Sequence, residues 1–168
     1  MVWIVKLEER QEGKIVSRRK VFTIDRPMVI DSSDDIGLGR EDANALLSSL
    51  QQILVTSQFD HDAGHRGACD TCGQKRNVKD YRSRKIDTLY GRVTIRRPRY
   101  LCPHCGPCHS PLIASSTPEF DLIRSTLAAH LPYRVASELL STLLPADSGT
   151  THTTIRNRIA HVAEQLKY

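Results

Sequence analysis

Apolar and charged residues alternate through the first part of the chain, in the pattern of a half-buried antiparallel hairpin. VWIVKLEE, residues 2–9, has the period of two that a strand requires. GKIVSRRKVFTIDRP, residues 13–27, repeats this pattern and ends at Pro27. Residues 12–14, Glu-Gly-Lys, provide a turn between the two stretches. The pattern therefore predicts a two-stranded hairpin and shows no chemistry of its own.

A helical pattern follows the hairpin. Residues 31–42, DSSDDIGLGRED, supply turn and capping residues for a helix that begins near their end. Apolar residues then recur at helical spacing on one face: Leu46, Leu47, Leu50, Ile53 and Leu54. We interpret this stripe as a core face, and a dimer seam is the alternative. DHDAGHRGA, residues 60–68, is interpreted as a linker, in which His61 and His65 are solvated residues or, alternatively, metal ligands.

All five cysteines lie in two short segments, GACDTCG and LCPHCGPCHS. Cys69-x2-Cys72 and Cys102-x2-Cys105 form two knuckles of the kind that hold a tetrahedral Zn²⁺, with sulfur about 2.3 Å from the metal. The intervening residues, 73–101, contain a second predicted hairpin that turns at Tyr90-Gly91 and brings the knuckles together. The sequence thus predicts a zinc-ribbon-like module with a structural zinc.

The region around the second knuckle holds more candidate ligands than one zinc site needs, so the identity of the fourth ligand stays open. Cys108 repeats the x2 spacing after Cys105, and His104 and His109 lie nearby. We favour Cys105, with Cys108 as the alternative. Thiol redox chemistry is a competing use of Cys-x-x-Cys, but a thioredoxin-like site needs one such motif at a helix start. A catalytic zinc would need an open position and a general acid or base, and no His-Glu-x-x-His motif is present. We predict no catalytic residue.

Positive charge is concentrated in the cysteine-bearing third of the chain. Residues 61–110 hold 11 Lys/Arg and 4 Asp/Glu, a net charge of +7, which exceeds the +5 of the whole protein. Such a patch favours nucleic acid as a partner, and a solvated basic surface is the alternative. The candidate phosphate contacts lie on the predicted hairpin: Arg82, Arg84, Lys85, Arg92, Arg96, Arg97 and Arg99.

Three helices are predicted in the last third. Thr117-Pro118-Glu119 opens the first, and the second carries an apolar face made of Val135, Leu139 and Leu143.

The third helix begins after Thr150 or Thr151, either of which can cap it. Its apolar face comprises Ile155, Ile159, Val162 and Leu166. The opposite face and its flanks would be available to a DNA major groove in a helix-turn-helix arrangement, and ordinary bundle packing is the alternative. The candidate DNA contacts on this helix are Thr153, Arg156, Asn157, Arg158 and His161.

Length and composition limit the other possibilities. No apolar run reaches the roughly 18 residues of a membrane helix, and the N-terminus lacks the pattern of a signal peptide. We therefore expect a cytoplasmic protein that has no membrane partner and no small-molecule substrate. Thiols stay reduced in that compartment, and an odd cysteine count also argues against a disulfide framework.

Several stretches together resemble the N-terminal region of bacterial insertion-sequence transposases of the ISKra type. They are SSDDIGLGREDANALLSSLQQILV, the first cysteine knuckle, IDTLYGRVTIRRPRY, LIRSTLAAHLPYRVASELLSTLLP and THTTIRNRIAHVA. The resemblance implies a zinc-ribbon-like region and a helix-turn-helix that bind the ends of a mobile element. In that family a catalytic RNase-H-like domain follows, and its acidic residues would lie beyond residue 168. We therefore expect binding to double-stranded DNA without catalysis.

The predicted architecture is α+β with three modules. Residues 1–60 form the hairpin and amphipathic helix, 61–112 the zinc-ribbon-like basic module, and 113–168 the helical DNA-binding module. Two other functions remain open: a protein-interaction or assembly module, in which a homo-oligomer is possible, and a thiol redox protein.

Overall fold

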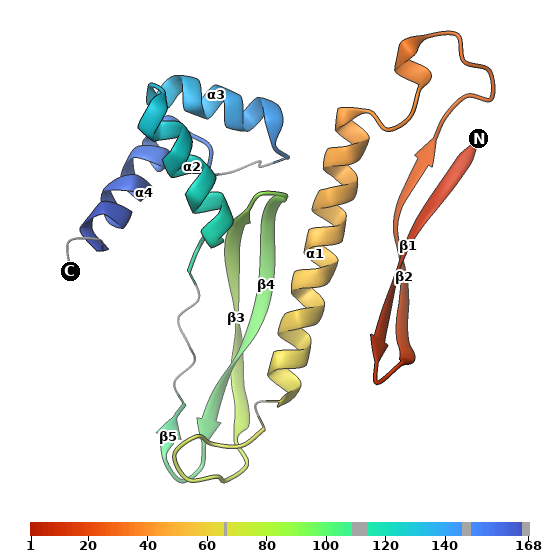
Figure 1. Ribbon diagram of the computed structural model, residues 1–168. Coiled ribbons are helices and arrows are strands. Elements are labelled where there is room, and N and C mark those ends of the chain that lie inside the picture. Colours follow the sequence, from red (N-terminus) through yellow and green to blue (C-terminus); the bar gives the residue numbers. More distant parts are fainter. Residues whose placement is uncertain (66, 109–113, 146–148, 166–168) are drawn as a thin grey trace.

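The computed structural model describes residues 1–65, 67–108, 114–145 and 149–165, with the backbone alone for residues 65 and 161–165. It is an α+β structure of two antiparallel hairpins and four α-helices (Figure 1). In chain order the elements are β1 (Val2–Gln11), β2 (Lys14–Asp25), the 3-10 turn η1 (Ser33–Asp35), α1 (Arg40–His65), β3 (Asn77–Thr88), β4 (Gly91–Cys102), β5 (Gly106–Pro107), α2 (Pro118–His130), α3 (Tyr133–Leu143) and α4 (His152–Gln165).

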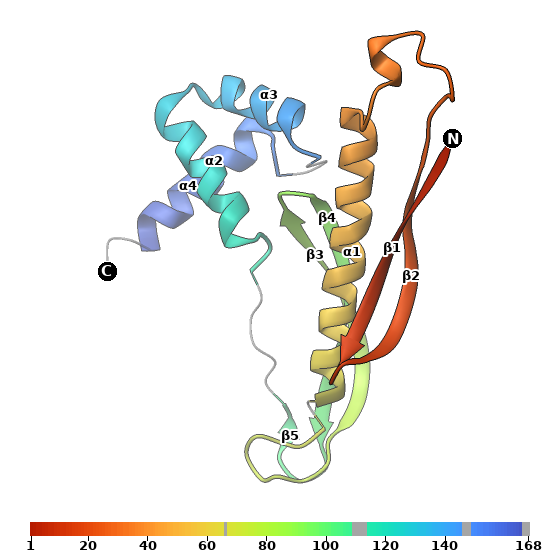
Figure 2. The same cartoon turned by 45° about the vertical axis from the view of Figure 1, so that its right-hand side comes forward.

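Helix α1 lies between the two hairpins and packs against β4 on one side and β2 on the other (Figures 1 and 2). Both predicted hairpins are confirmed, with antiparallel register and turns at residues 12–13 and 89–90. The predicted linker at 60–68 is wrong over its first six residues, because α1 continues through His65. The helix therefore also crosses the boundary that the sequence placed after residue 60.

The core between α1 and the second hairpin is small and apolar. Ile86, Val93 and Ile95 are at most 7% exposed and pack with Val55 and Phe59 of α1. Alternation along β4 explains this arrangement, because every second side chain near the turn points to the helix.

The three C-terminal helices pack around a second core at the turn end of β3 and β4 (Figure 1). Its fully buried members are Phe120, Ala136, Leu140 and Ile155. The predicted apolar face of α3 is wrong: Val135 and Leu143 are 40% and 66% exposed, and the buried face is shifted by one residue. Tertiary contacts select that neighbouring stripe because the small Ala136 side chain allows close packing against the other helices.

The start of α4 agrees with the sequence. The Thr151 side chain accepts a hydrogen bond from the Thr154 amide, so Thr151 caps the helix. Ile155 is buried as predicted and Ile159 packs beside it. The predicted positions of Val162 and Leu166 fall outside the described side chains. Within the described ranges no helix is long and apolar enough to cross a membrane.

Candidate metal centre and basic hairpin

The first knuckle is a tight turn that connects α1 to β3. The Cys69 amide donates to the Gln74 carbonyl at 2.8 Å, and the Gly73 amide donates to the Cys69 carbonyl at 2.8 Å. Gly73 has a φ of 71°, in the left-handed region where a side chain is disfavoured. These bonds fold the backbone back beneath Cys69 and Cys72, so both sulfurs point to the same side.

The second knuckle closes the end of β4. Cys102 is the last residue of β4, and the short strand β5 returns antiparallel so that Gly106 pairs with Cys102. Gly106 has a φ of 83°, which permits the reversal. Because β3 and β4 form a hairpin, the second knuckle lies beside the first at one end of the molecule (Figure 1).

The structure brings four cysteines together: Cys69, Cys72, Cys102 and Cys105. Their sulfurs all lie within 4.8 Å of one another, and the Cys72 and Cys102 sulfurs are 3.5 Å apart. A disulfide would need about 2.05 Å, whereas four thiolates around one tetrahedral Zn²⁺ lie about 3.8 Å apart. The spacing therefore fits a metal ion, and the all-sulfur donor set is typical of structural zinc.

Electrostatics within the cluster also favour a cation. Hydrogen bonds from the Thr71 and Cys72 amides hold the pKa of the Cys69 thiol at about 6. The neighbouring Cys72 sulfur raises the pKa of Cys105 to about 12. Thiolates this close repel one another, so all four ionise together only when a positive ion lies between them.

The candidate fourth ligands differ in whether they lie in the cysteine cluster. Cys105 belongs to the four-sulfur group, whereas the Cys108 sulfur lies 3.9 Å from the Gly106 carbonyl oxygen. His104, although described, is not part of the group. His109 falls outside the described residues. The structure therefore places Cys105, and not Cys108, beside the other three sulfurs.

A contact chain links the knuckles to α1. Arg76 is 6% exposed, and its guanidinium lies over the Tyr100 ring at 4.6 Å and 3.6 Å from the Asp70 carboxylate. The Tyr100 hydroxyl donates to the Ala63 carbonyl in the last turn of α1. These contacts therefore connect the four-cysteine cluster to the C-terminal end of α1.

The basic residues of the β3–β4 hairpin fall into two groups, which sequence spacing did not distinguish. In the first group, Arg92 and Arg99 form ion pairs with Asp87 and Asp80 on the opposite strand. The hydrogen-bonded ion pair with Arg99 lowers the pKa of the Asp80 carboxyl. Arg96 stacks over Tyr81, 4.4 Å from the ring centroid. All three side chains therefore make their contacts within the hairpin itself.

The second group follows β3 and is exposed: Arg82, Arg84 and Lys85. Arg82 lies directly opposite the half-buried Arg97 in the register. Like charges directly across a strand pair are destabilising.

Of the DNA contacts that the sequence predicts on α4, three side chains are exposed and one binds another residue of the protein. Thr153, Arg156 and Asn157 are exposed. Arg158 is half-buried and donates to the Asp121 carboxylate at 3.0 and 2.6 Å. This ion pair favours a structural role for Arg158 over a phosphate contact. The side chain of His161 falls outside the described residues.

Sequence reasoning missed a buried charge network beneath α2. Arg124 is 2% exposed, stacks over Phe120 at 4.1 Å and donates to Asp121, Ser116 and the Gly149 carbonyl. The signal was present in the sequence, because an arginine four residues after Phe120 lies on the same helical face. A charge on a face that must be buried requires partners.

Comparison with known proteins does not assign the chain to a family. A scan against protein-family models gave no match, and neither did a search of the curated proteins.

Proposed function

We propose that this chain is a DNA-binding module whose basic hairpin is held in shape by a structural zinc ion. The observation that carries the proposal is the position of the four-cysteine cluster at the base of the hairpin that displays Arg82, Arg84 and Lys85. Metal binding would stabilise a segment with few buried apolar residues. The exposed side chains of Arg82, Arg84 and Lys85 would contact phosphates.

Helix α4 supplies the second proposed contact. Its exposed residues Thr153, Arg156 and Asn157 lie on a helix fixed by the core at Ile155 and by the Asp121–Arg158 pair. A helix presented in this way can enter a major groove and read base edges, whereas the hairpin row contributes affinity that is independent of sequence. The resemblance to ISKra-type transposases makes the ends of a mobile element the proposed DNA target.

A redox function is less well supported. The first Cys-x-x-Cys motif lies in the turn between α1 and β3 and the second lies between β4 and β5, and all four sulfurs converge on one point. A thiol–disulfide enzyme needs one accessible pair, and a second pair at the same point would serve no purpose in that chemistry.

The test measures duplex affinity against salt concentration. The double variant Arg82→Ala/Arg84→Ala is expected to weaken binding and to reduce the slope of log K against log salt by about 2, since each phosphate contact contributes about 0.9. Lys6→Ala/Arg134→Ala removes the same charge from exposed positions elsewhere and is the matched control. Equal slopes in the two variants would contradict the proposal.

A further inference from the structure

The β1–β2 hairpin is chemically different at its two ends. At the open end, where the chain begins, many large apolar side chains are exposed. They are Met1, Val2, Trp3, Ile4, Met28, Val29, Ile30, Ile36 and Leu38, with exposed fractions from 46% to 82%. Soluble proteins rarely leave so many neighbouring apolar residues open without a partner.

Seven of these residues, all except Val2 and Val29, line a groove of about 550 Å³. Its wall includes Trp3, Ile24, Met28 and Ile36. The surrounding segment is acidic: residues 21–42 hold six Asp/Glu and two Lys/Arg, a net charge of −4. A segment that fills this groove should therefore combine apolar side chains with positive charge.

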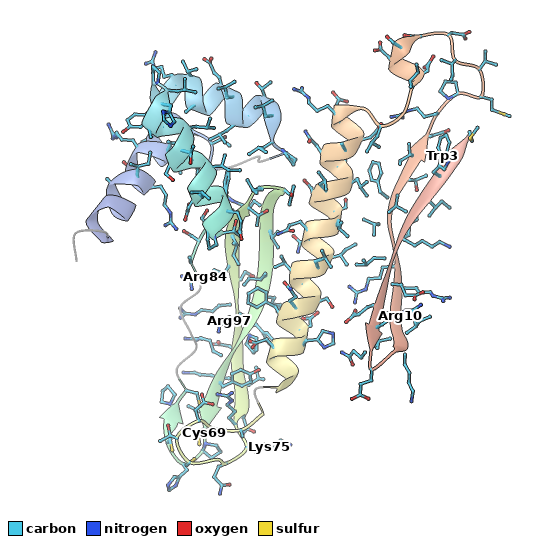
Figure 3. The ribbon with its side chains drawn as sticks, viewed as in Figure 1. Trp3, Arg10, Cys69, Lys75, Arg84 and Arg97 are labelled. Atoms are coloured by element: carbon cyan, nitrogen blue, oxygen red, sulfur yellow. The ribbon has the colours of Figure 1, made fainter. Side chains whose placement is uncertain are left out.

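The turn end of the same hairpin has that composition. Ile15 and Val16 are 44% and 54% exposed. Residues 10–20 hold five Lys/Arg and one Glu, a net charge of +4. Figure 3 shows Trp3 at the open end of the hairpin and Arg10 toward its turn. The two ends thus match in apolar character and have equal and opposite charge.

One edge of the hairpin is also available for pairing. Within the described residues β1 pairs with β2 alone, and α1 packs against β2. The first five residues of the chain carry no charged side chain that would block pairing with another strand. Strand addition at such an edge is a common mode of association.

We propose that this surface binds a second copy of the chain, with the two hairpins antiparallel about a two-fold axis. The antiparallel arrangement sets the turn end of each hairpin beside the open end of the other, so each complementary contact occurs twice. Ile15 and Val16 of each copy fill the groove of the other, and the +4 segment faces the −4 segment. Charge complementarity selects this orientation, because a parallel arrangement would place like charges together.

The test is the mass of the full-length protein in solution, measured by sedimentation. The wild type is expected to have twice the mass of one chain at about 0.1 mM. Lys14→Glu/Lys20→Glu and Asp31→Lys/Asp34→Lys reverse exposed charges at the two ends and are each expected to weaken association at least about tenfold. Val16→Asp should have the same effect through loss of the apolar contact.

Mixing the two charge-reversed variants distinguishes this interface from any other. Each variant alone places a neutralised segment, of net charge 0, against an unchanged charged segment at both contacts, so the attraction between the segments is lost. In a mixed pair one contact joins the unchanged +4 and −4 segments, and the other joins the two substituted segments, whose introduced Glu and Lys side chains are opposite in charge. Mixing should therefore restore association. Arg134→Glu on α3 is the control and should remain dimeric. A wild type that stays monomeric at that concentration, or reversed variants that associate as well as the wild type, would overturn the proposal.

Discussion

Two long antiparallel hairpins pack against the same helix, and they differ in what stabilises them. The β3–β4 hairpin buries three apolar side chains under α1 and ends in four clustered cysteines. No residue of the β1–β2 hairpin is buried. Side-chain contacts such as Arg26 with Asp42 and His61 with Glu9 connect it to α1 and its first turn.

The comparison shows that an alternating strand pattern alone does not determine how firmly a hairpin is held. An isolated two-stranded hairpin is marginal in water, so each one needs additional stabilisation. We infer that a metal ion and a core provide it for β3–β4, and that a second copy of the chain provides it for β1–β2. Variants of each hairpin can test this difference.

Removal of one metal ligand should have the largest effect. Cys102 is 1% exposed, and Cys102→Ser is expected to abolish stoichiometric metal binding. Because structural zinc contributes directly to folding, the free energy of unfolding should fall by several kcal/mol, on the order of 5. Metal content and urea unfolding measure both effects. Cys108→Ser is the control and should keep its metal, and equal loss in the two variants would contradict the proposed ligand set.

Truncation of an apolar side chain to alanine should have the second-largest effect and should distinguish the two hairpins. Ile95→Ala is expected to cost about 2–5 kcal/mol, since its side chain is 1% exposed in the core under α1. Leu7→Ala, at a half-buried position of β1, should cost only about 1 kcal/mol. Urea unfolding followed by circular dichroism gives both values. Equal costs would show that the hairpins are held equally firmly.

The smallest effect concerns pH at the first hairpin. A hydrogen bond with His61 lowers the pKa of Glu9 from its ordinary value of 4.5. Because the folded pKa is depressed, this contact stabilises docking of the hairpin above about pH 4.5 and is lost as the pH falls through the lowered pKa. Hydrogen exchange in β1 should therefore accelerate in acid.

Glu9→Gln removes the titrating group at this contact and should reduce that acceleration. Glu12→Gln changes an exposed turn residue and is the control. An identical acid response in wild type and Glu9→Gln would show that this contact does not hold the hairpin.

Local patterns predicted most of the elements. Alternation identified both hairpins, cysteine spacing identified the four-sulfur group, and Pro118 marked the start of α2. These features depend on residues close in sequence or on the strict geometry of metal ligands. For the same reason the spacing of the cysteines was enough to predict the four-cysteine cluster.

Long-range packing determined what the patterns missed. Helix α1 continues to His65 because its last turns contact other elements, including the Tyr100 hydroxyl at Ala63. The division of the hairpin arginines depends on which aspartate lies across the strand, as with Arg99 and Asp80. Such pairings depend on register, which residue spacing along one strand does not specify.

The central claim is that a metal ion holds the basic hairpin, and the metal content of the natively purified full chain tests it most directly. Elemental analysis is expected to find one zinc per chain, with Cys108 the only thiol that reacts before chelation. Protein without metal, in which all five thiols react freely, would contradict the account.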